Sequence, residues 1–345
     1  MLRTRQELRW SSPQARREAD LFYADLVGRQ ARGLGSYGYR PSEFSEADEG
    51  YDEAAPVVLP AGFRMGVWLD VGGRSLADNG SQHASRLHAM GMTDACIMVN
   101  AVESTTFDFG SVSQARLRSF SDLLRGSTIR LTLTSWLRPT RAYIDGLLRD
   151  LPTCAQTLGA RAIEFDVEEP WTHQTPSGFA THDEAADYLF AGLATARAAG
   201  LEVAVTCQVD QVGTTKMGRI LQNADVVIPQ AYSVTGTGSA FAVGGAYGPR
   251  GLQDRAARRL SSAVSASGKP LIMGLAAYGR HHWSQTSRDI MKLELEETVT
   301  LGSSNAIRGA RYWSWKHIVG INGRGGSPAN TYASAFLQDI AQPPP

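Results

Sequence analysis

The 345-residue sequence has few cysteines and no excess of charge of either sign. Its 34 basic residues equal its 34 acidic residues, so no net field steers the protein onto nucleic acid or an anionic membrane. The three cysteines, Cys96, Cys154 and Cys207, are far apart and form no C-x-x-C motif. They therefore indicate neither a disulfide framework nor a structural zinc site, and we interpret them as small buried apolar residues.

Long hydrophobic runs are also missing. No stretch approaches the roughly 18 apolar residues that a membrane-spanning helix requires. The first residues, Met-Leu-Arg-Thr-Arg-Gln-Glu, lack the apolar region of a signal peptide. We therefore expect synthesis in the cytoplasm, no membrane insertion, and export only by release or injection through separate machinery.

From about residue 62 onward, short apolar runs alternate with amphipathic stretches. We predict strands at 64–71, 95–101, 128–136, 162–168, 201–208, 225–232, 270–276 and 310–315. We predict helices at 81–90, 113–125, 141–158, 181–199, 215–222, 253–267 and 284–301. Most of these helices are followed by Gly, which favours the left-handed residue after a helix. The pattern predicts an α/β fold, a closed (βα)8 barrel. The alternative is a doubly wound open sheet, but no G-x-G-x-x-G motif follows the first strand.

Residues 1–61 do not follow this alternation and form a predicted N-terminal extension to a barrel over 62–345. Ser12 and Pro13 suit the start of a helix, and an apolar stripe follows them. The stretch 43–53 contains six acids and no base, which is typical of a solvated linker. The extension is either a helix that covers one end of the barrel or a segment for delivery or docking.

Acidic residues gather at the end of the fourth predicted strand. Side chains alternate along a strand, so Glu164, Asp166 and Glu168 share one face and the apolar residues between them share the other. The apolar face must meet the helices, so the carboxylates point into the barrel. Their mutual repulsion predicts a raised pKa for at least one of them. We expect Glu164 to pair with Arg130 on the third strand, whereas Glu169 is a rim residue.

The other two acids suit acid catalysis. Asp166 and Glu168 are about 6.6 Å apart along the strand, with Glu168 nearer the mouth of the barrel. We predict that Glu168 protonates a leaving oxygen while the deeper Asp166 stays ionised and stabilises positive charge on the substrate. The alternative is an internal network of ion pairs.

Tryptophans cluster at the same end of the predicted barrel. Of seven tryptophans, all but Trp10 are within a few residues of the end of a predicted strand. Flat indole rings stack on the apolar faces of sugars, so we expect some to contact a saccharide and the others to fill the core. The candidate sugar contacts are Trp68, Trp136, Trp171, Trp313 and Trp315.

Further polar residues end strands at this mouth. They are Asp70, Gln208, Gln230, Tyr232 and, after the seventh strand, Tyr278. Tyr232 could donate a hydrogen bond to a carbonyl group or a developing charge, and a structural hydrogen bond is the alternative for each residue. The pair His281-His282 completes no ligand set of suitable spacing, so we expect no metal and no other cofactor.

The run Ile163-Glu-Phe-Asp166-Val-Glu168 resembles the D-x-E signature of TIM-barrel glycoside hydrolases. Met65-Gly-Val-Trp-Leu-Asp70 resembles the first strand of the family 25 lysozymes, or muramidases. That resemblance implies that Glu168 is the acid, Asp166 the stabilising carboxylate and Asp70 a carboxylate that positions the substrate.

Two other runs, Gln230-Ala-Tyr232 and Tyr312-Trp313-Ser-Trp315, resemble strands six and eight of the family 18 chitinases and endo-N-acetylglucosaminidases. This resemblance implies that Tyr232 holds the N-acetyl group and that one Trp forms the floor of a sugar subsite. In the full family pattern D-x-x-D-x-D-x-E, this sequence has Arg161 and Glu164 at the first two acidic positions.

The sequence thus predicts a retaining glycosidase for β-1,4 bonds beside N-acetylated sugars, with peptidoglycan preferred over chitin. Such an enzyme would be delivered by separate machinery, as a wall-degrading toxin or a phage-type enzyme is. The alternatives are a chitinase-like or endo-N-acetylglucosaminidase-like hydrolase, a non-catalytic carbohydrate-binding barrel and a metal-dependent barrel hydrolase.

Overall fold

The computed structural model describes residues 57–70, 73–100, 104–109, 114–208, 211, 214–231, 269–277, 288–302, 307–319 and 331–341. The predictions for the N-terminal extension, apart from its last few residues, and for the helix at 253–267 lie outside these ranges. So do the predictions for Tyr232 and Tyr278.

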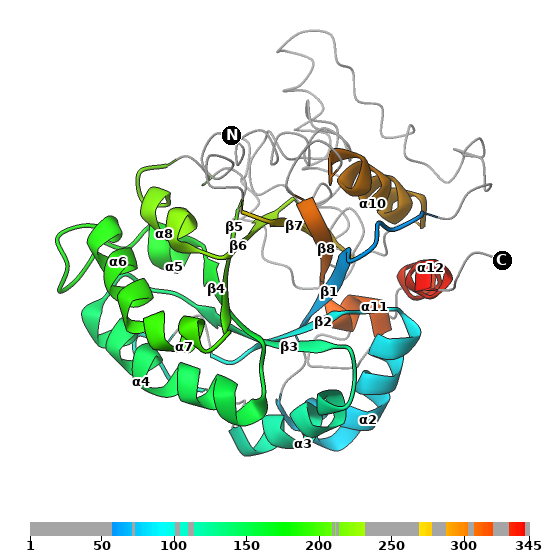
Figure 1. Ribbon diagram of the computed structural model, residues 1–345, viewed down its shortest axis with the longest axis horizontal. Helices are drawn as coiled ribbons and strands as arrows, with labels where there is room; N and C mark the ends of the chain where they lie inside the picture. The colour runs from blue at the N-terminus through cyan, green and yellow to red at the C-terminus, as the bar shows by residue number, and fades with distance from the viewer. Residues whose placement is uncertain are drawn as a thin grey trace, which may run out of the picture.

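The described strands form one closed barrel, which confirms the predicted (βα)8 TIM barrel (Figure 1). Each strand is parallel to its two neighbours, and β1 closes the ring by pairing with β8. The strands are β1 (Arg64–Leu69), β2 (Asp94–Met98), β3 (Arg130–Trp136), β4 (Ala162–Val167), β5 (Glu202–Gln208), β6 (Val226–Gln230), β7 (Leu271–Ala276) and β8 (Ile307–Trp313).

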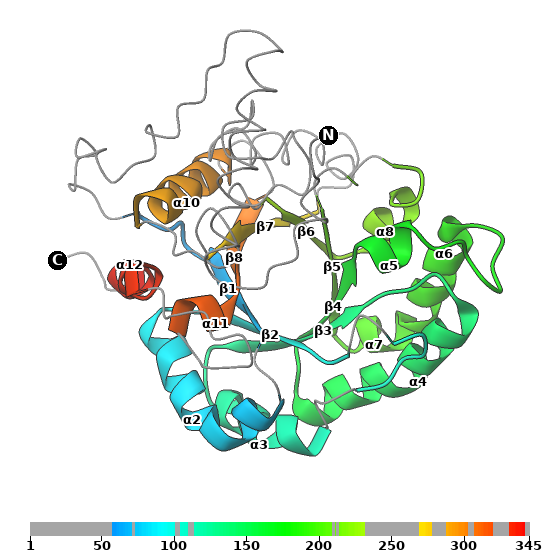
Figure 2. The same ribbon diagram turned by 180° about the vertical axis from the view of Figure 1, so that it is seen from behind.

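Helices surround the strands, as the view from behind also shows (Figure 2). The longer ones are α2 (Gly73–Ala89), α3 (Gln114–Arg125), α4 (Arg141–Leu158), α6 (His182–Gly192), α10 (Arg288–Gly302) and α12 (Thr331–Ala341). The shorter ones are α5 (Glu169–Thr172), α7 (Ala194–Ala198), α8 (Gly218–Asn223) and α11 (Trp315–Val319). Within the described residues, no helix is both long and apolar enough to cross a membrane.

Local signals set several helix ends. Gly159 adopts φ 65° after α4 and donates its N–H to the last turn, as expected for a left-handed cap. Thr181 caps α6 by accepting a hydrogen bond from the Glu184 N–H, and the Glu184 side chain accepts one from Ala180. The predicted helix at 181–199 is instead two helices, α6 and α7, with Leu193 between them at φ −90° and ψ −3°.

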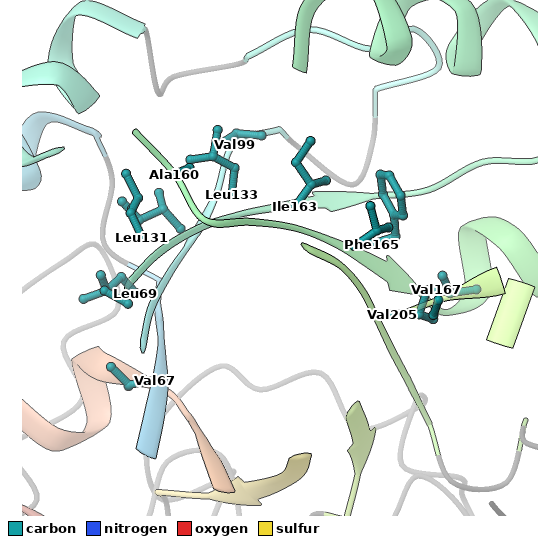
Figure 3. Close-up of a cluster of buried hydrophobic side chains, with 14 of the residues drawn as sticks. Val67, Leu69, Val99, Leu131, Leu133, Ala160, Ile163, Phe165, Val167 and Val205 are labelled. Atoms are coloured by element: carbon teal, nitrogen blue, oxygen red, sulfur yellow. The ribbon is translucent and has the colours of Figure 1, made fainter. Parts of the chain in front are cut away.

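The main hydrophobic core lies between the barrel wall and the helices. Ile163, Phe165 and Val167 of β4 point outward into this layer, next to Leu133 of β3 and Val205 of β5 (Figure 3). Since alternate residues of β4 face the lumen, the outward apolar side chains fix Glu164 and Asp166 on the inside.

A second, smaller apolar cluster fills part of the lumen. Its buried members are Trp68, Cys96, Ala204, Val226, Ile228 and Ile272. Two glycines make room for larger groups there. A Cβ atom on Gly66 would be 3.0 Å from Nε of Arg311, and one on Gly274 would be 3.3 Å from the Trp68 ring.

An ion-pair network closes the opposite, N-terminal end of the barrel. Arg64 pairs with Asp94 at 2.5 Å and with Glu202 at 3.0 Å. Arg130 also pairs with Glu202, at 3.2 Å. The expected pairing of Arg130 with Glu164 is therefore wrong, because Arg130 begins β3 at the end of the barrel where Glu202 begins β5.

Candidate active site

The C-terminal end of β4 brings two carboxyl groups to the barrel mouth. Asp166 is the buried penultimate residue of this strand, and the half-buried Glu168 follows the strand as the residue before α5. The Thr172 hydroxyl donates to the Glu168 carbonyl at 3.0 Å and fixes this turn. In barrels of this type, ligands bind at the C-terminal ends of the strands.

Two glutamine side chains hold these carboxyl groups. The Gln230 amide nitrogen donates to Glu168 Oε1 at 2.6 Å and to Asp166 Oδ1 at 3.3 Å. The Gln208 amide nitrogen donates to Glu168 Oε2 at 3.2 Å. Asp166 and Glu168 also share a hydrogen bond with one another. Two of the sequence-predicted site residues, Gln208 and Gln230, thus act directly on the predicted pair.

Burial raises the pKa of both acids. The pKa of Asp166 is well above its usual value because the carboxyl is desolvated and Glu168 repels its charged form. The pKa of Glu168 is also raised by desolvation, although the hydrogen bonds from Gln230 and Gln208 oppose this. The expectation that the deeper Asp166 stays ionised remains a prediction, and the raised pKa of Asp166 favours its protonated form instead. Desolvation is the largest cause of the shift at both acids, and it favours their protonated forms.

Glu164 lies one layer deeper in the lumen and is fully buried. It accepts a hydrogen bond from the Trp68 indole nitrogen at 2.7 Å. Its other carboxylate oxygen is paired with the guanidinium of Arg311, from β8. Glu164 has the structural ion pair that the sequence predicted, but its cationic partner is Arg311.

Asp70, at the end of β1, is also held by protein groups. Its carboxylate accepts hydrogen bonds from the Ser314 hydroxyl at 2.6 Å and from the Lys316 backbone at 3.1 Å. The Lys316 ammonium is 2.8 Å from Oδ2 of the same carboxylate. These contacts give Asp70 a structural role at the mouth, beside the substrate-positioning role that the resemblance implies.

The five candidate tryptophans have different surroundings. Trp136, beside Asp166 in the strand register, and Trp313 are half-buried at the mouth. Trp313 packs edge to face against Trp68, which is 4% exposed inside the lumen. Trp171 and Trp315 are fully buried, and their indole nitrogens donate to the Lys216 carbonyl and to His83. These two rings belong to the core, so Trp136 and Trp313 are the described indoles placed to meet a ligand.

Sequence reasoning did not single out three residues that shape this site: Arg311, Ser314 and Lys316. A signal for Arg311 was present, because it is the one charged residue inside the predicted eighth strand at 310–315. Ser314 and Lys316 carry no comparable signal, since they fall where the strand turns into α11. Among the described side chains, no group of three or more His, Cys, Asp or Glu residues forms a candidate metal site.

No family model matches this sequence, and a comparison with curated proteins finds no match. Solved structures do share its fold. The spore cortex-lytic enzyme SleL of Bacillus megaterium QM B1551 superposes with a TM-score of 0.52 at 11% identity, over 80% of this chain and 73% of that one. A GH113 β-1,4-mannanase gives a TM-score of 0.56 at 13% identity, over 83% of this chain and 99% of that one.

A GH18 chitinase from Pseudoalteromonas aurantia gives a TM-score of 0.55 at 10% identity, over 80% of this chain and 99% of that one. At such low identities, these similarities establish the fold alone. The protein is a (βα)8 TIM barrel that shares its fold with these solved structures.

Proposed function

We propose that this protein is a retaining glycoside hydrolase that cleaves β-1,4 bonds next to N-acetylated sugars, with peptidoglycan as its preferred substrate. The observation that carries this proposal is the hydrogen-bonded pair of Asp166 and Glu168 at the barrel mouth. A half-buried indole, Trp313, offers an apolar surface for a sugar ring at the same mouth.

The closeness of the two acids favours one type of mechanism. In retaining enzymes with a protein nucleophile the carboxyl groups are about 5 Å apart, and in inverting enzymes about 6.5–9.5 Å, to leave room for water. Asp166 and Glu168 share a hydrogen bond and one glutamine donor, so the two carboxyl groups are in direct contact. Such a pair suits a reaction in which the substrate's own acetamido oxygen is the nucleophile.

The shared proton supplies the acid. In the free protein, Asp166 holds the proton and donates it toward Glu168. When substrate binds, the proton passes from Asp166 to Glu168. Glu168 gives it to the leaving glycosidic oxygen as the glycosidic bond breaks and the acetamido oxygen bonds to the anomeric carbon. The ionised Asp166 stabilises the positive charge that develops on the acetamido group, and water then opens the oxazolinium and returns a proton to the pair. The burial that raises the pKa of both acids favours retention of this proton.

Two of the proteins of similar fold support a polymeric glycan substrate, since they are described as a spore cortex-lytic enzyme and a chitinase. The direct test is digestion of purified peptidoglycan and chitin side by side, with mass spectrometry of the products. The proposal predicts new reducing ends from peptidoglycan in excess of those from chitin. Preferential cleavage of chitin would support a chitinase-like enzyme instead.

A matched pair of variants separates catalysis from binding. Glu168→Gln keeps the size of the acid and removes its proton, so turnover should fall by at least about a thousandfold while the fold is retained. Glu169→Gln changes the adjacent exposed carboxylate and should retain most of the turnover. Glycan binding without released reducing ends in the wild-type protein would identify a carbohydrate-binding barrel and refute the proposal.

A further inference from the structure

Trp136 ends β3 beside the acid pair. It is the register partner of Asp166 in the neighbouring strand β4. Leu133 of β3 points outward into the main core (Figure 3), so Trp136, three positions later, faces the lumen. Since neighbouring strands are about 5 Å apart, the two side chains start next to one another at the barrel mouth.

The Trp136 indole is not held by the hydrophobic core. It is half-buried and belongs to neither of the two apolar clusters of the described residues, whereas Trp313 packs against the lumen cluster. The indole nitrogens of Trp68, Trp171 and Trp315 donate to protein groups. That of Trp136 meets no protein acceptor in the part of the chain that the structure describes. The position of this ring therefore depends on how its backbone is held.

Three buried side chains hold that backbone: Asn100, Ser135 and Tyr143. Asn100 Oδ1 accepts a hydrogen bond from the Trp136 N–H at 2.9 Å. The hydroxyls of Tyr143 and Ser135 donate to the Trp136 carbonyl at 2.8 Å and 2.7 Å. The Asn100 amide nitrogen also donates to the Tyr143 hydroxyl, which links both sides of the peptide. We call these three residues the Trp136 clamp.

The Trp136 clamp does the work of a neighbouring strand. β2 ends at Met98, whose register partner is Thr134, and the Val99 N–H donates to the Thr134 carbonyl at 2.8 Å. Trp136 lies beyond this last pairing, so side chains satisfy its backbone groups in place of a β-ladder. Burial raises the pKa of Tyr143 to about 12, so its hydroxyl keeps its proton and remains a donor at neutral pH.

We propose that the Trp136 clamp positions the Trp136 indole as a wall of the sugar subsite beside Asp166, so that Asn100 and Tyr143 are positioning residues for substrate. Neither touches the sugar, and both act through Trp136. Because β3 adjoins β4 and β8 lies across the ring (Figure 1), Trp136 and Trp313 border the mouth on different sides. This inference rests on the proposed function, which supplies the sugar.

Steady-state kinetics with soluble N-acetylated oligosaccharides from peptidoglycan tests this role. Tyr143→Phe removes a donor to the Trp136 carbonyl and the acceptor of the Asn100 amide. KM should therefore rise about fivefold while kcat stays within about twofold of the wild type, because the clamp contacts neither acid. Tyr188→Phe is the matched control. It removes a tyrosine hydroxyl that donates to the exposed Asp145, and it should leave both constants unchanged.

A double-mutant cycle shows whether Tyr143 acts through Trp136. Trp136→Ala should raise KM about tenfold. Adding Tyr143→Phe should raise KM no further, because no indole is left to position. A purely structural tyrosine would lower stability, and its effect on KM would add to that of Trp136→Ala. Additive effects, or an unchanged KM in Tyr143→Phe, would overturn the inference.

A second variant covers the case in which Tyr143→Phe does not fold. Ser135→Ala removes the other hydroxyl that donates to the Trp136 carbonyl, with only a small loss of volume. It takes the place of Tyr143→Phe in the same cycle. The inference again predicts a raised KM in the single variant and no added effect once Trp136 is alanine, and an unchanged KM would again overturn it.

A readout independent of turnover separates this inference from the proposed function. The indole N–H resonance of Trp136 in the full-length protein, assigned with Trp136→Phe, reports the surroundings of the ring. Tyr143→Phe should shift and broaden this resonance, and Tyr188→Phe should leave it in place. A changed resonance in a protein that cleaves no glycan would refute the proposed function and leave the positioning of Trp136 intact. Cleavage of glycan with an unchanged resonance in Tyr143→Phe would refute this inference alone.

Discussion

The ammonium of Lys316 lies 2.8 Å from the carboxylate of Asp70, across the junction of β1 and β8. The same carboxylate accepts hydrogen bonds from the Ser314 hydroxyl and the Lys316 backbone. Asp70, the residue after β1, therefore holds in place the turn between β8 and α11. This junction also carries Trp313, the half-buried indole at the mouth.

Asp70→Ala should destabilise the protein by about 1–3 kcal/mol, because it leaves the buried Ser314 hydroxyl and the Lys316 N–H without an acceptor. Lys316→Met is the matched control. It removes only an ammonium that is 42% exposed and should cost less than about 1 kcal/mol. Urea unfolding measures both changes. An Asp70→Ala protein of wild-type stability that has lost turnover would instead favour a direct role of Asp70 on the substrate.

Asp166→Asn should stabilise the fold at neutral pH. Because the pKa of Asp166 is higher in the folded than in the unfolded state, its contribution to stability is full below its unfolded pKa, about 3.9, and declines as the pH rises toward the folded pKa. An amide has no proton to lose, so the variant should gain about 0.5–2 kcal/mol at pH 8 and nothing at pH 3.5. Urea titrations at the two pH values check this. A gain of equal size at both would rule out the titration of Asp166 as its cause.

The fold was predictable from the sequence because outward apolar residues and helix-ending glycines recur with each βα unit. The same alternation correctly placed Glu164 and Asp166 in the lumen. It could not choose the partner of Glu164, since Arg130 and Arg311 lie on different strands and only the stagger of the closed barrel decides which arginine reaches that layer. It also could not separate the buried Trp171 and Trp315 from the half-buried Trp313, because an indole at a strand end suits both the core and a sugar.

Gly274→Ala should disturb the lumen beneath the site. The added Cβ would be 3.0 Å from the Pro229 carbonyl, 3.2 Å from Cα of Gln230 and 3.3 Å from the Trp68 ring. We expect a loss of about 1–3 kcal/mol in unfolding free energy and reduced turnover, as Gln230 moves away from the acids. Gly218→Ala is the control, since its Cβ meets no atom within 4 Å. Equal stability of the two variants would contradict the packing described for Gly274.

Trp313→Ala and Trp315→Ala should change different properties: the first should weaken substrate binding and the second should lower the stability of the fold. Trp313 is half-buried at the mouth, so its loss should raise KM for a glycan about tenfold with a smaller effect on kcat. Trp315 is fully buried and bonded to His83, so its loss should cost about 3–5 kcal/mol of stability. Steady-state kinetics and thermal unfolding distinguish the two effects. An unchanged KM in Trp313→Ala would remove this ring from the substrate site.

The central claim is that Asp166 and Glu168 act together on a glycan whose own acetamido group is the nucleophile. Proton NMR of the first products tests it most directly, with N-acetylated β-1,4 oligosaccharides from peptidoglycan and chitin compared with the same chains after de-N-acetylation. The account predicts that the N-acetylated chains are cleaved to the β-anomer and that the de-N-acetylated chains remain intact. An initial α-anomer, or equal cleavage of both kinds of chain, would contradict it.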